Sequence, residues 1–283
     1  MSNQLTERST EENLDTTQGS VVLMADAFCD EGVDELKSSG CTVTLDPSLK
    51  DETLLAAISD MNPDILVVRS TKVSCKMLDA SERLSVVIRA GAGYDTIDIE
   101  GASNRGIFVA NCPGKNSIAV AELTWALILS CDRRVPDQVI ELRDGTWNKK
   151  EFSDAKGLHG RTLGIVGFGG IGQEVAKRGI AFGMKVIAWS RSLTDEKASE
   201  LGVCICDSLI DLAKMSDVVS VHVSKTTETD QLIDTPFLNA MKDGSIFVNT
   251  SRGNIIDESS LVNATKEKKL RVGLDVYIDE PTM

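Results

Sequence analysis

The chain has 283 residues, of which 42% are hydrophobic and 26% are charged, and its formal net charge is −13. The length favours two domains of moderate size, and the composition is that of a globular protein. A chain this acidic is a poor partner for nucleic acid or an anionic membrane, and no apolar run approaches the ~20 residues of a membrane span. We therefore expect neither partner, and an anionic ligand must be held by a local group of cations.

Cysteine and histidine usage limits the chemistry further. Seven cysteines, an odd number, are scattered through apolar stretches, which indicates reduced thiols and a cytoplasmic location. Cys204 and Cys206 alternate along an apolar run, so we expect them in a strand rather than on a metal. His159 and His222 are the only histidines, which nearly excludes a histidine-rich site, and no metal is expected.

Residues 1–19 are polar and lack hydrophobic periodicity, which predicts a disordered tail. Short apolar runs then alternate with helical stretches. Strands are predicted at 20–25, 41–45, 64–68 and 86–88, and helices at 32–39 and 51–59. This alternation is typical of βαβ units with a parallel sheet. It places Arg69 and Arg89 at the carboxyl ends of strands, where open α/β sheets bind ligands.

A break at 112–114 precedes a long apolar helix predicted over 117–130, with Ser117 as its N-cap. This helix is a good candidate for the element that joins two domains, at 20–116 and 117–283. Further on, we predict an amphipathic segment at 136–147 and strands at 162–166, 185–189, 218–223, 245–249 and 272–276. The fold class is therefore α/β, with two doubly wound parallel sheets of the Rossmann or flavodoxin kind.

A glycine-rich turn follows the strand at 162–166 and precedes a helix predicted over 173–182. It has the pattern G-x-G-x-x-G, formed by Gly167, Phe168, Gly169, Gly170, Ile171 and Gly172. Such glycines allow a tight turn and a close approach of the backbone to a pyrophosphate, which then lies at the helix N-terminus. The pattern alone is weak evidence, because a structural turn can produce it. Its position between strand and helix favours dinucleotide binding.

The next strand, at 185–189, ends without the acidic residue that usually binds the adenosine ribose. Ser190, Arg191 and Ser192 stand there instead. A carboxylate repels the 2′-phosphate of NADP, whereas an arginine with neighbouring hydroxyl groups attracts it. This stretch predicts that NADPH is accepted at least as well as NADH. The alternative is that Arg191 is an ordinary surface residue.

Beyond residue 20, the chain resembles the D-isomer-specific 2-hydroxyacid dehydrogenases, and among them most the phosphoglycerate dehydrogenases. The matching stretches include the glycine loop and Asp257, and otherwise lie at 68–73, 89–95, 111–117, 121–123, 248–253 and 274–281. The resemblance implies an oxidoreductase that uses NAD or NADP, with its active site in the cleft between the two domains. Its reaction would be hydride transfer between the nicotinamide and C2 of a 2-hydroxy or 2-oxo acid.

The resemblance also implies roles for particular residues. Arg252 would hold the substrate carboxylate and polarise the C2 oxygen, and the amides near Ala92 and Gly93 would take the same carboxylate. Glu280 would pair with a catalytic histidine. The residues implied to contact the cofactor, besides those already named, are Thr250, Asp275 and His222. As bare residues, Arg252, Asp275 and Glu280 could equally be solvated charges at strand ends and in loops.

One departure from the family pattern concerns the catalytic histidine. The family places it shortly after the Glu-Pro motif, and this sequence ends at Met283. His222 occupies a family position near the cofactor, so we expect it to pack there and not to act as the base. The sequence is therefore expected to be a fragment of a longer chain, or a product without its own acid–base group.

Positive charge near the expected substrate site favours a phosphorylated substrate, namely 3-phosphoglycerate and 3-phosphohydroxypyruvate of serine biosynthesis. The residues assigned to substrate binding are Arg69, Lys72, Arg89, Asn116 and Arg134. The resemblance implies a homodimer formed through 117–150. One alternative is an NADP-dependent hydroxypyruvate or glyoxylate reductase, which needs no phosphate site. Another is a corepressor-like protein that binds the dinucleotide without turnover.

Overall fold

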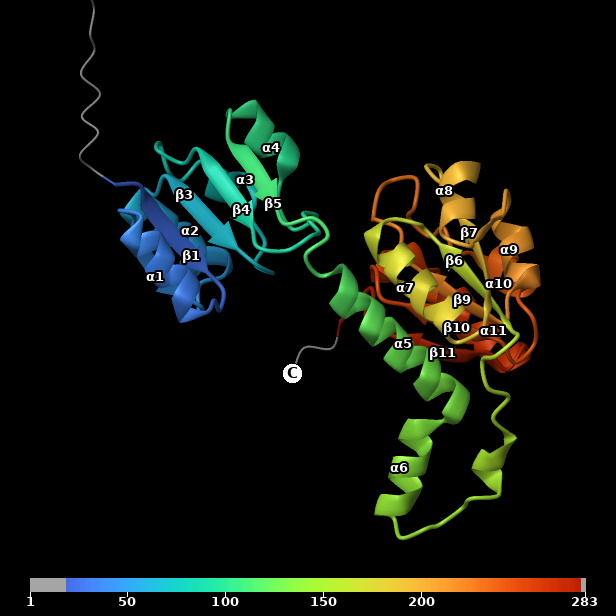
Figure 1. Cartoon of the computed structure of the whole chain (residues 1–283). Coiled ribbons are helices and arrows are strands. Elements are labelled where there is room, and N and C mark those ends of the chain that lie inside the picture. The colour runs from blue at the N-terminus through green and yellow to red at the C-terminus, as the bar shows by residue number, and fades with distance from the viewer. Residues whose placement is uncertain (1–18, 281–283) are drawn as a thin grey trace, which may run out of the picture. The chain divides into compact units, whose positions relative to one another are not determined.

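The computed structural model of the protein describes residues 19–280, which form two compact units (Figure 1). Unit 1 ends at Pro113 and unit 2 begins at Gly114, whereas the sequence places the domain boundary between 116 and 117. The predicted tail, apart from Gly19, lies outside the described residues. Within residues 19–280, no helix has the length and apolar content needed to cross a membrane.

Unit 1 is built on a five-stranded, all-parallel sheet with the order β2-β1-β3-β4-β5. The strands are β1 (Val21–Ala25), β2 (Thr42–Asp46), β3 (Ile65–Val68), β4 (Val86–Arg89) and β5 (Phe108–Asn111). The helices are α1 (Asp30–Ser38), α2 (Asp51–Met61), α3 (Cys75–Leu78) and α4 (Ile99–Asn104). This strand order is the flavodoxin type of doubly wound sheet, which confirms the predicted fold class for this half of the chain.

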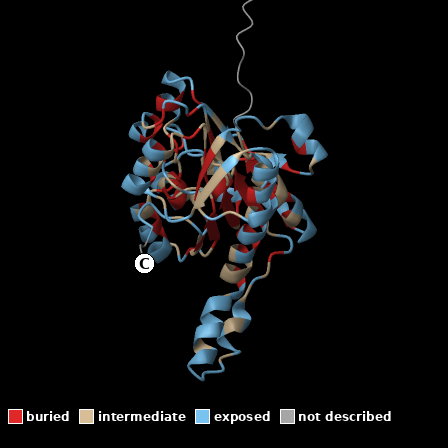
Figure 2. Ribbon diagram, turned by 90° about the vertical axis from the view of Figure 1, so that its left-hand side faces the viewer, coloured by how far each residue is buried: buried red, intermediate tan, exposed pale blue. Residues whose placement is uncertain are grey.

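Both faces of this sheet are packed, because successive side chains of a strand point to opposite faces. Leu23 of β1 joins the cluster that contains Leu54 and Ile58 of α2. Its neighbours Val22 and Met24 pack on the other face. The buried strand residues stand out in red in Figure 2. The apolar runs seen in the sequence are therefore strands covered on two sides.

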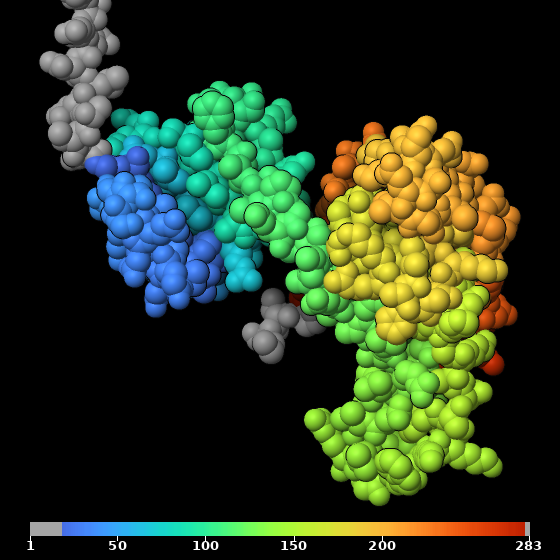
Figure 3. All heavy atoms as spheres, in the orientation of Figure 1, coloured from blue at the N-terminus to red at the C-terminus, as the bar shows by residue number. Residues whose placement is uncertain are grey.

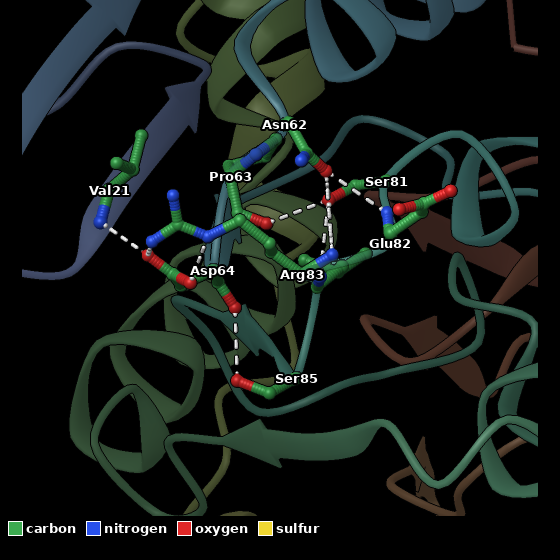
Figure 4. Close-up of polar contacts among 9 residues, drawn as sticks. Val21, Asn62, Pro63, Asp64, Ser81, Glu82, Arg83 and Ser85 are labelled. Atoms are coloured by element: carbon green, nitrogen blue, oxygen red, sulfur yellow. Dashed lines mark hydrogen bonds and ion pairs between the residues drawn. The ribbon is translucent and has the colours of Figure 1, made fainter. Parts of the chain in front are cut away.

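Polar side chains fasten the amino ends of the central strands of unit 1 (Figure 4). The Asp64 carboxylate accepts hydrogen bonds from the Val21 amide (2.7 Å) and from the Arg83 guanidinium (2.8 and 3.0 Å). The Asn62 side chain accepts from the Ser81 hydroxyl (2.7 Å) and the Glu82 amide (3.0 Å). These contacts lie at the sheet edge opposite to the strand ends that carry Arg69 and Arg89, so they serve the fold.

Unit 2 contains a six-stranded parallel sheet with the order β11-β10-β9-β6-β7-β8. The strands are β6 (Thr162–Val166), β7 (Lys185–Trp189), β8 (Cys204–Ile205), β9 (Val218–Val221), β10 (Ile246–Asn249) and β11 (Arg271–Leu274). The helices around it are α7 (Gly170–Ala181), α8 (Asp195–Glu200), α9 (Leu209–Met215), α10 (Thr235–Ala240) and α11 (Glu258–Glu267). Numbered from β6, this order is that of the dinucleotide-binding Rossmann fold.

Helix α5 (Ser117–Arg133) packs against α7, β10 and β11 and so belongs to unit 2. The predicted N-cap is wrong: Asn116 occupies the cap position without a side-chain hydrogen bond, and Ser117 is the first helical residue. The reason is that the Ser117 side chain packs inward, close enough that a Cβ on Gly170 would lie 2.9 Å from its Oγ. Ser117 is accordingly buried.

An arm, formed by residues 134–154, extends from the end of α5 and projects from the body of unit 2 (Figures 1 and 3). Arg134 adopts a left-handed conformation, which ends α5, and Pro136 lies in the first turn of α6 (Val135–Arg143). A short 3-10 helix, η1 (Glu151–Asp154), leads back toward β6. The arm exposes several apolar side chains, namely Val135, Val139, Ile140, Leu142 and Trp147.

Candidate functional site

The glycine loop lies at the carboxyl end of β6, and two of its glycines, Gly167 and Gly172, are required by close backbone contacts. Gly167 has a φ of +94°, and a Cβ there would lie 2.7 Å from the His222 carbonyl group. A Cβ at Gly172 would lie 2.4 Å from the Gly167 carbonyl oxygen, so this glycine lets α7 approach the loop. A Cβ at Gly169, by contrast, would meet no atom within 4 Å. The loop is therefore packed on one side and open at Gly169.

The open side of the loop coincides with the N-terminus of α7, where Gly169 is the cap residue. The first amides of a helix have no acceptor within the helix and attract anions. Phe168 is buried and Ile171 packs against the same core, so both side chains hold the loop against the core of unit 2. These residues fit the pyrophosphate of a dinucleotide.

We expect Gly169→Ala to weaken NADH binding at least tenfold without lowering the unfolding free energy. The methyl group has room within the protein, but it enters the space that a pyrophosphate needs at the helix N-terminus. Fluorescence titration with NADH and urea unfolding measure the two quantities. Gly32→Ala in α1, where the nearest atom would lie 3.7 Å away, is the matched control. Unchanged NADH affinity in Gly169→Ala would move the pyrophosphate site elsewhere.

At the end of β7, the structure adds a residue that the sequence pattern did not reveal. Arg191 forms an ion pair with Glu228, a residue of the loop after β9. Both side chains are about 70% exposed. Ser190 and Ser192 are joined by two long contacts of 3.5 Å, one between their hydroxyl oxygens and one from the Ser192 amide to the Ser190 hydroxyl oxygen. Arg191 is thus at the end of β7 as predicted, and the Glu228 carboxylate contacts its guanidinium.

His222 follows β9 directly and lies beside the glycine loop. Its amide donates to the Val166 carbonyl (2.7 Å), and a hydrogen bond joins its Nε2 to Ser220 Oγ (2.8 Å). Nδ1 is buried and has no partner within the described residues. Burial lowers the pKa of His222 to about 3, so the imidazole is neutral near pH 7. A group with this pKa is poorly matched to acid–base catalysis at neutral pH.

The partly buried imidazole of His222 should make the unfolding free energy depend on pH. The unfolded chain binds a proton on His222 below about pH 6.5, whereas the folded state does not until about pH 3. Above pH 6.5, His222 therefore does not lower the unfolding free energy. Below it, this one group lowers the unfolding free energy by at most about 1.4 kcal/mol per pH unit. Urea unfolding of wild type and His222→Gln between about pH 5 and 7 tests this. Parallel curves for the two proteins would contradict the lowered pKa of His222.

His159 lies at the other end of the sheet. It precedes β6, and its ring packs against Gly183, where a Cβ would lie 2.5 Å from the imidazole. Gly183 in turn precedes β7. Both positions are at the amino ends of these strands, whereas the glycine loop follows their carboxyl ends, roughly 16 Å away for a strand of this length. Neither histidine of the chain is therefore suited to proton transfer at the cofactor.

The loop that carries Arg252 is fixed by the buried side chain of Asn249. The Asn249 amide oxygen accepts from the Ser251 amide (3.0 Å) and hydroxyl (2.6 Å), and its nitrogen donates to the Arg252 carbonyl (2.9 Å). Arg252 also donates from its guanidinium to the Ser251 carbonyl (2.7 Å). Thr250 is buried, and its hydroxyl contacts that of Thr124 in α5 (3.0 Å). The loop is therefore preorganised by contacts that the motif alone did not reveal.

The segment after β11 packs on the Arg252 loop. A Cβ at Gly253 would lie 2.1 Å from the Tyr277 carbonyl carbon, so only glycine fits beneath this segment. The Ile278 amide donates to the Glu258 carboxylate (2.8 Å), and the Asp275 amide donates to the Asn249 carbonyl (3.1 Å). Arg252, Asp275 and the loop leading to Glu280 are thus brought together in unit 2. Glu280 itself is exposed at the end of the described residues.

In unit 1, Asp26 organises the loop that carries Arg69 and Lys72. Its carboxylate accepts from the amides of Arg69 (2.7 Å), Ser70 (3.1 Å) and Thr71 (3.2 Å), and from the Ser70 hydroxyl (2.9 Å). Burial alone would raise the pKa of Asp26, but these hydrogen bonds outweigh it and lower the pKa. The side chains of Arg69 and Lys72 are exposed and have no acidic partner among residues 19–280.

The turn after β4 is held by two side chains. Arg89 folds back over Gly91, where a Cβ would lie 1.5 Å from its guanidinium, and its Nε is buried without a partner in the described part of the chain. The Asn111 amide donates to the Ala92 carbonyl (2.7 Å). Because C=O and N–H of a trans peptide point in opposite directions, Asn111 directs the Gly93 amide away from itself. No acceptor within residues 19–280 takes the Ala92 or Gly93 amide.

The remaining predicted substrate residues lie in unit 2. Asn116 caps α5. Arg134 forms ion pairs with Asp137 (2.8 Å) and Glu151 (2.9 Å) and lies over the Phe152 ring (4.8 Å), all within the arm. The hydrogen bonds that Arg134 donates to these two carboxylates raise the pKa of its guanidinium. Its assignment to substrate binding stays a prediction.

The chain is similar in sequence to known dehydrogenases that bind a dinucleotide. A family model described as D-isomer specific 2-hydroxyacid dehydrogenase, NAD binding domain, matches residues 125–283. The chain is 40% identical over 262 residues to the D-3-phosphoglycerate dehydrogenase of Methanocaldococcus jannaschii, covering 92% of this chain and 49% of that protein. It is 43% identical over 241 residues to the hydroxypyruvate reductase of Thermotoga maritima, covering 84% and 76%.

A crystal structure of a protein from Thermus thermophilus superposes with a TM-score of 0.83 at 35% identity, and the match covers 93% of this chain and 84% of that one. The chain spans about half the length of the phosphoglycerate dehydrogenase that it matches. Its second unit is the NAD-binding domain of this family, and the solved structure of an acyclic imino acid reductase, 28% identical with a TM-score of 0.82, is a complex with NADPH. The chain belongs to the D-isomer-specific 2-hydroxyacid dehydrogenase family.

Proposed function

We propose that the protein transfers a hydride between a nicotinamide cofactor and C2 of 3-phosphohydroxypyruvate or D-3-phosphoglycerate. The nicotinamide supplies the hydride chemistry when bound. Arg252 holds the substrate carboxylate and stabilises negative charge on the C2 oxygen, and its rigid loop keeps the guanidinium oriented. The Ala92 and Gly93 amides, which have no acceptor in the described part of the chain, bind the same carboxylate.

The observation that carries the choice of substrate is the loop fixed by Asp26. It presents Arg69 and Lys72 without acidic partners among residues 19–280, in a chain whose net charge is −13. Exposed cations that are neither paired nor needed for packing suit a phosphate group. The 40% identity to a D-3-phosphoglycerate dehydrogenase supports the same substrate.

The test compares 3-phosphohydroxypyruvate with hydroxypyruvate in wild type and Arg69→Ala. We expect Arg69→Ala to weaken binding of the phosphorylated acid roughly ten- to a hundredfold, the effect of ~1.5–3 kcal/mol for a lost charge-assisted contact. Binding of hydroxypyruvate should change little. Arg83→Ala, whose guanidinium is bound to Asp64, controls for a general loss of positive charge. An unchanged affinity in Arg69→Ala would refute the phosphate assignment.

Hydroxypyruvate reduction is the second candidate. The hydroxypyruvate reductase of Thermotoga maritima is 43% identical, and the chain covers more of its length than of the phosphoglycerate dehydrogenase. Such an enzyme needs no phosphate contact. Equal binding of hydroxypyruvate and its phosphorylated form by wild type would favour this reading.

We further propose a homodimer through residues 117–150 and a cytoplasmic location. The apolar side chains exposed on the arm, including Ile140 and Trp147, support the first proposal. The seven cysteines of the sequence all lie within the described residues and none is paired, which supports the second. Light scattering of wild type and Ile140→Glu tests the dimer, which this substitution should dissociate.

A further inference from the structure

The ion pair between Arg191 and Glu228 lies at the end of the dinucleotide site that binds adenosine. Arg191 follows β7, and Glu228 belongs to the loop after β9. These two strands flank β6 on its two sides in the parallel sheet. The pair therefore joins the loops on either side of the strand whose end carries Gly167. In this fold, the adenosine ribose binds at the end of β7.

The surroundings of Ser190 are acidic. A cavity of about 420 Å³ is lined by Ser190 together with Asp195, Glu196 and Asp207, and no lysine or arginine contributes to its lining. Arg191 follows Ser190 directly in the sequence, and its guanidinium already contacts a carboxylate. A 2′-phosphate entering here would meet several negative charges, whereas a ribose diol could donate hydrogen bonds to them.

We propose that Glu228 determines the cofactor preference of this chain: by neutralising Arg191, it makes the site select NADH over NADPH. The inference rests on the proposed function only in that unit 2 binds a nicotinamide dinucleotide. It differs from the expectation drawn from Ser190, Arg191 and Ser192 alone, because the sequence does not show which acidic residue lies beside the arginine.

The exposure of the pair indicates that its effect is on selectivity rather than on folding. Exposed ion pairs contribute little to stability, so Glu228→Gln should leave the unfolding transition unchanged. It should however remove a like charge from the neighbourhood of the 2′-phosphate and release the Arg191 guanidinium to contact it. The interaction is between exposed charges and is therefore weakened by salt.

The test is equilibrium titration with NADH and NADPH, followed by fluorescence, of wild type, Glu228→Gln, Arg191→Ala and the double variant. Wild type should bind NADH the more tightly. Glu228→Gln should tighten NADPH binding about tenfold at low salt and change NADH binding less than about twofold. The gain should be lost in the double variant and at high salt. Glu151→Gln, which removes a similarly exposed partner of Arg134, should change neither affinity.

Two results would overturn the inference while leaving the dinucleotide site intact. One is a wild type that binds NADPH at least as tightly as NADH. The other is a ratio of the two affinities that Glu228→Gln does not change. If neither dinucleotide binds to wild type, the proposed function itself fails, and the inference falls with it.

Discussion

Replacing Arg252 with alanine should weaken the binding of a 2-oxo acid to the protein–NADH complex about ten- to a hundredfold, while NADH binding is retained. The guanidinium is the group assigned to the substrate carboxylate, and its loop is fixed by Asn249. Calorimetric titration of 3-phosphohydroxypyruvate into the NADH-saturated protein measures the first quantity. Arg252→Lys should recover only part of the affinity, because an ammonium cannot bind a carboxylate through two parallel hydrogen bonds.

Arg191→Ala is the control for this experiment, since it removes an exposed arginine from the same unit. It should leave binding of the 2-oxo acid unchanged. A loss of NADH affinity in Arg252→Ala equal to the loss of substrate affinity would show that the arginine serves the cofactor or the fold instead.

The second large effect is expected for Gly253→Ala. The added methyl group would lie 2.1 Å from the Tyr277 carbonyl carbon and 2.5 Å from the Ile278 nitrogen, so backbone on one side must move. Overpacking of this kind typically costs about 1–3 kcal/mol. We expect a lower unfolding free energy for unit 2, together with weaker 2-oxo acid binding, because both the Arg252 loop and the Asp275 segment are displaced.

Gly169→Ala provides the contrast, because its methyl group meets no protein atom. It should affect NADH binding and not stability, whereas Gly253→Ala should affect both stability and substrate binding. Urea unfolding and the two titrations separate these outcomes. A Gly253→Ala protein with wild-type stability would mean that the segment at Tyr277 does not pack on the Arg252 loop.

The alternation of apolar runs predicted the fold class and most strands to within one or two residues. β6 and β7 were predicted with the bounds that the structure shows, because each is a short run of buried residues between glycine or polar positions. β5 was missed, since Phe108 and Ala110 are exposed and the strand has no continuous buried run. Burial on two faces is what makes a strand visible in the sequence.

The site was only partly predictable, for a different reason. The glycine loop and the Arg252 motif are local patterns, and each can be read from consecutive residues. Asp26 and Glu228, by contrast, act on Arg69 and Arg191, which lie 43 and 37 residues away in the chain. Such contacts arise only when parallel strands bring their carboxyl ends to one edge of a sheet. The position of Asn249 within a recognised motif likewise did not reveal its hydrogen bonds to the next residues.

The central claim is that hydride passes between the nicotinamide and C2 of a 2-oxo acid on this protein. It is tested most directly with NADH that carries deuterium at the transferred position of the nicotinamide. After incubation with 3-phosphohydroxypyruvate, mass spectrometry should find one deuterium at C2 of the D-3-phosphoglycerate formed, even if turnover is slow. NADH that binds tightly but leaves no labelled product would contradict the account and favour a protein that binds the dinucleotide without using it.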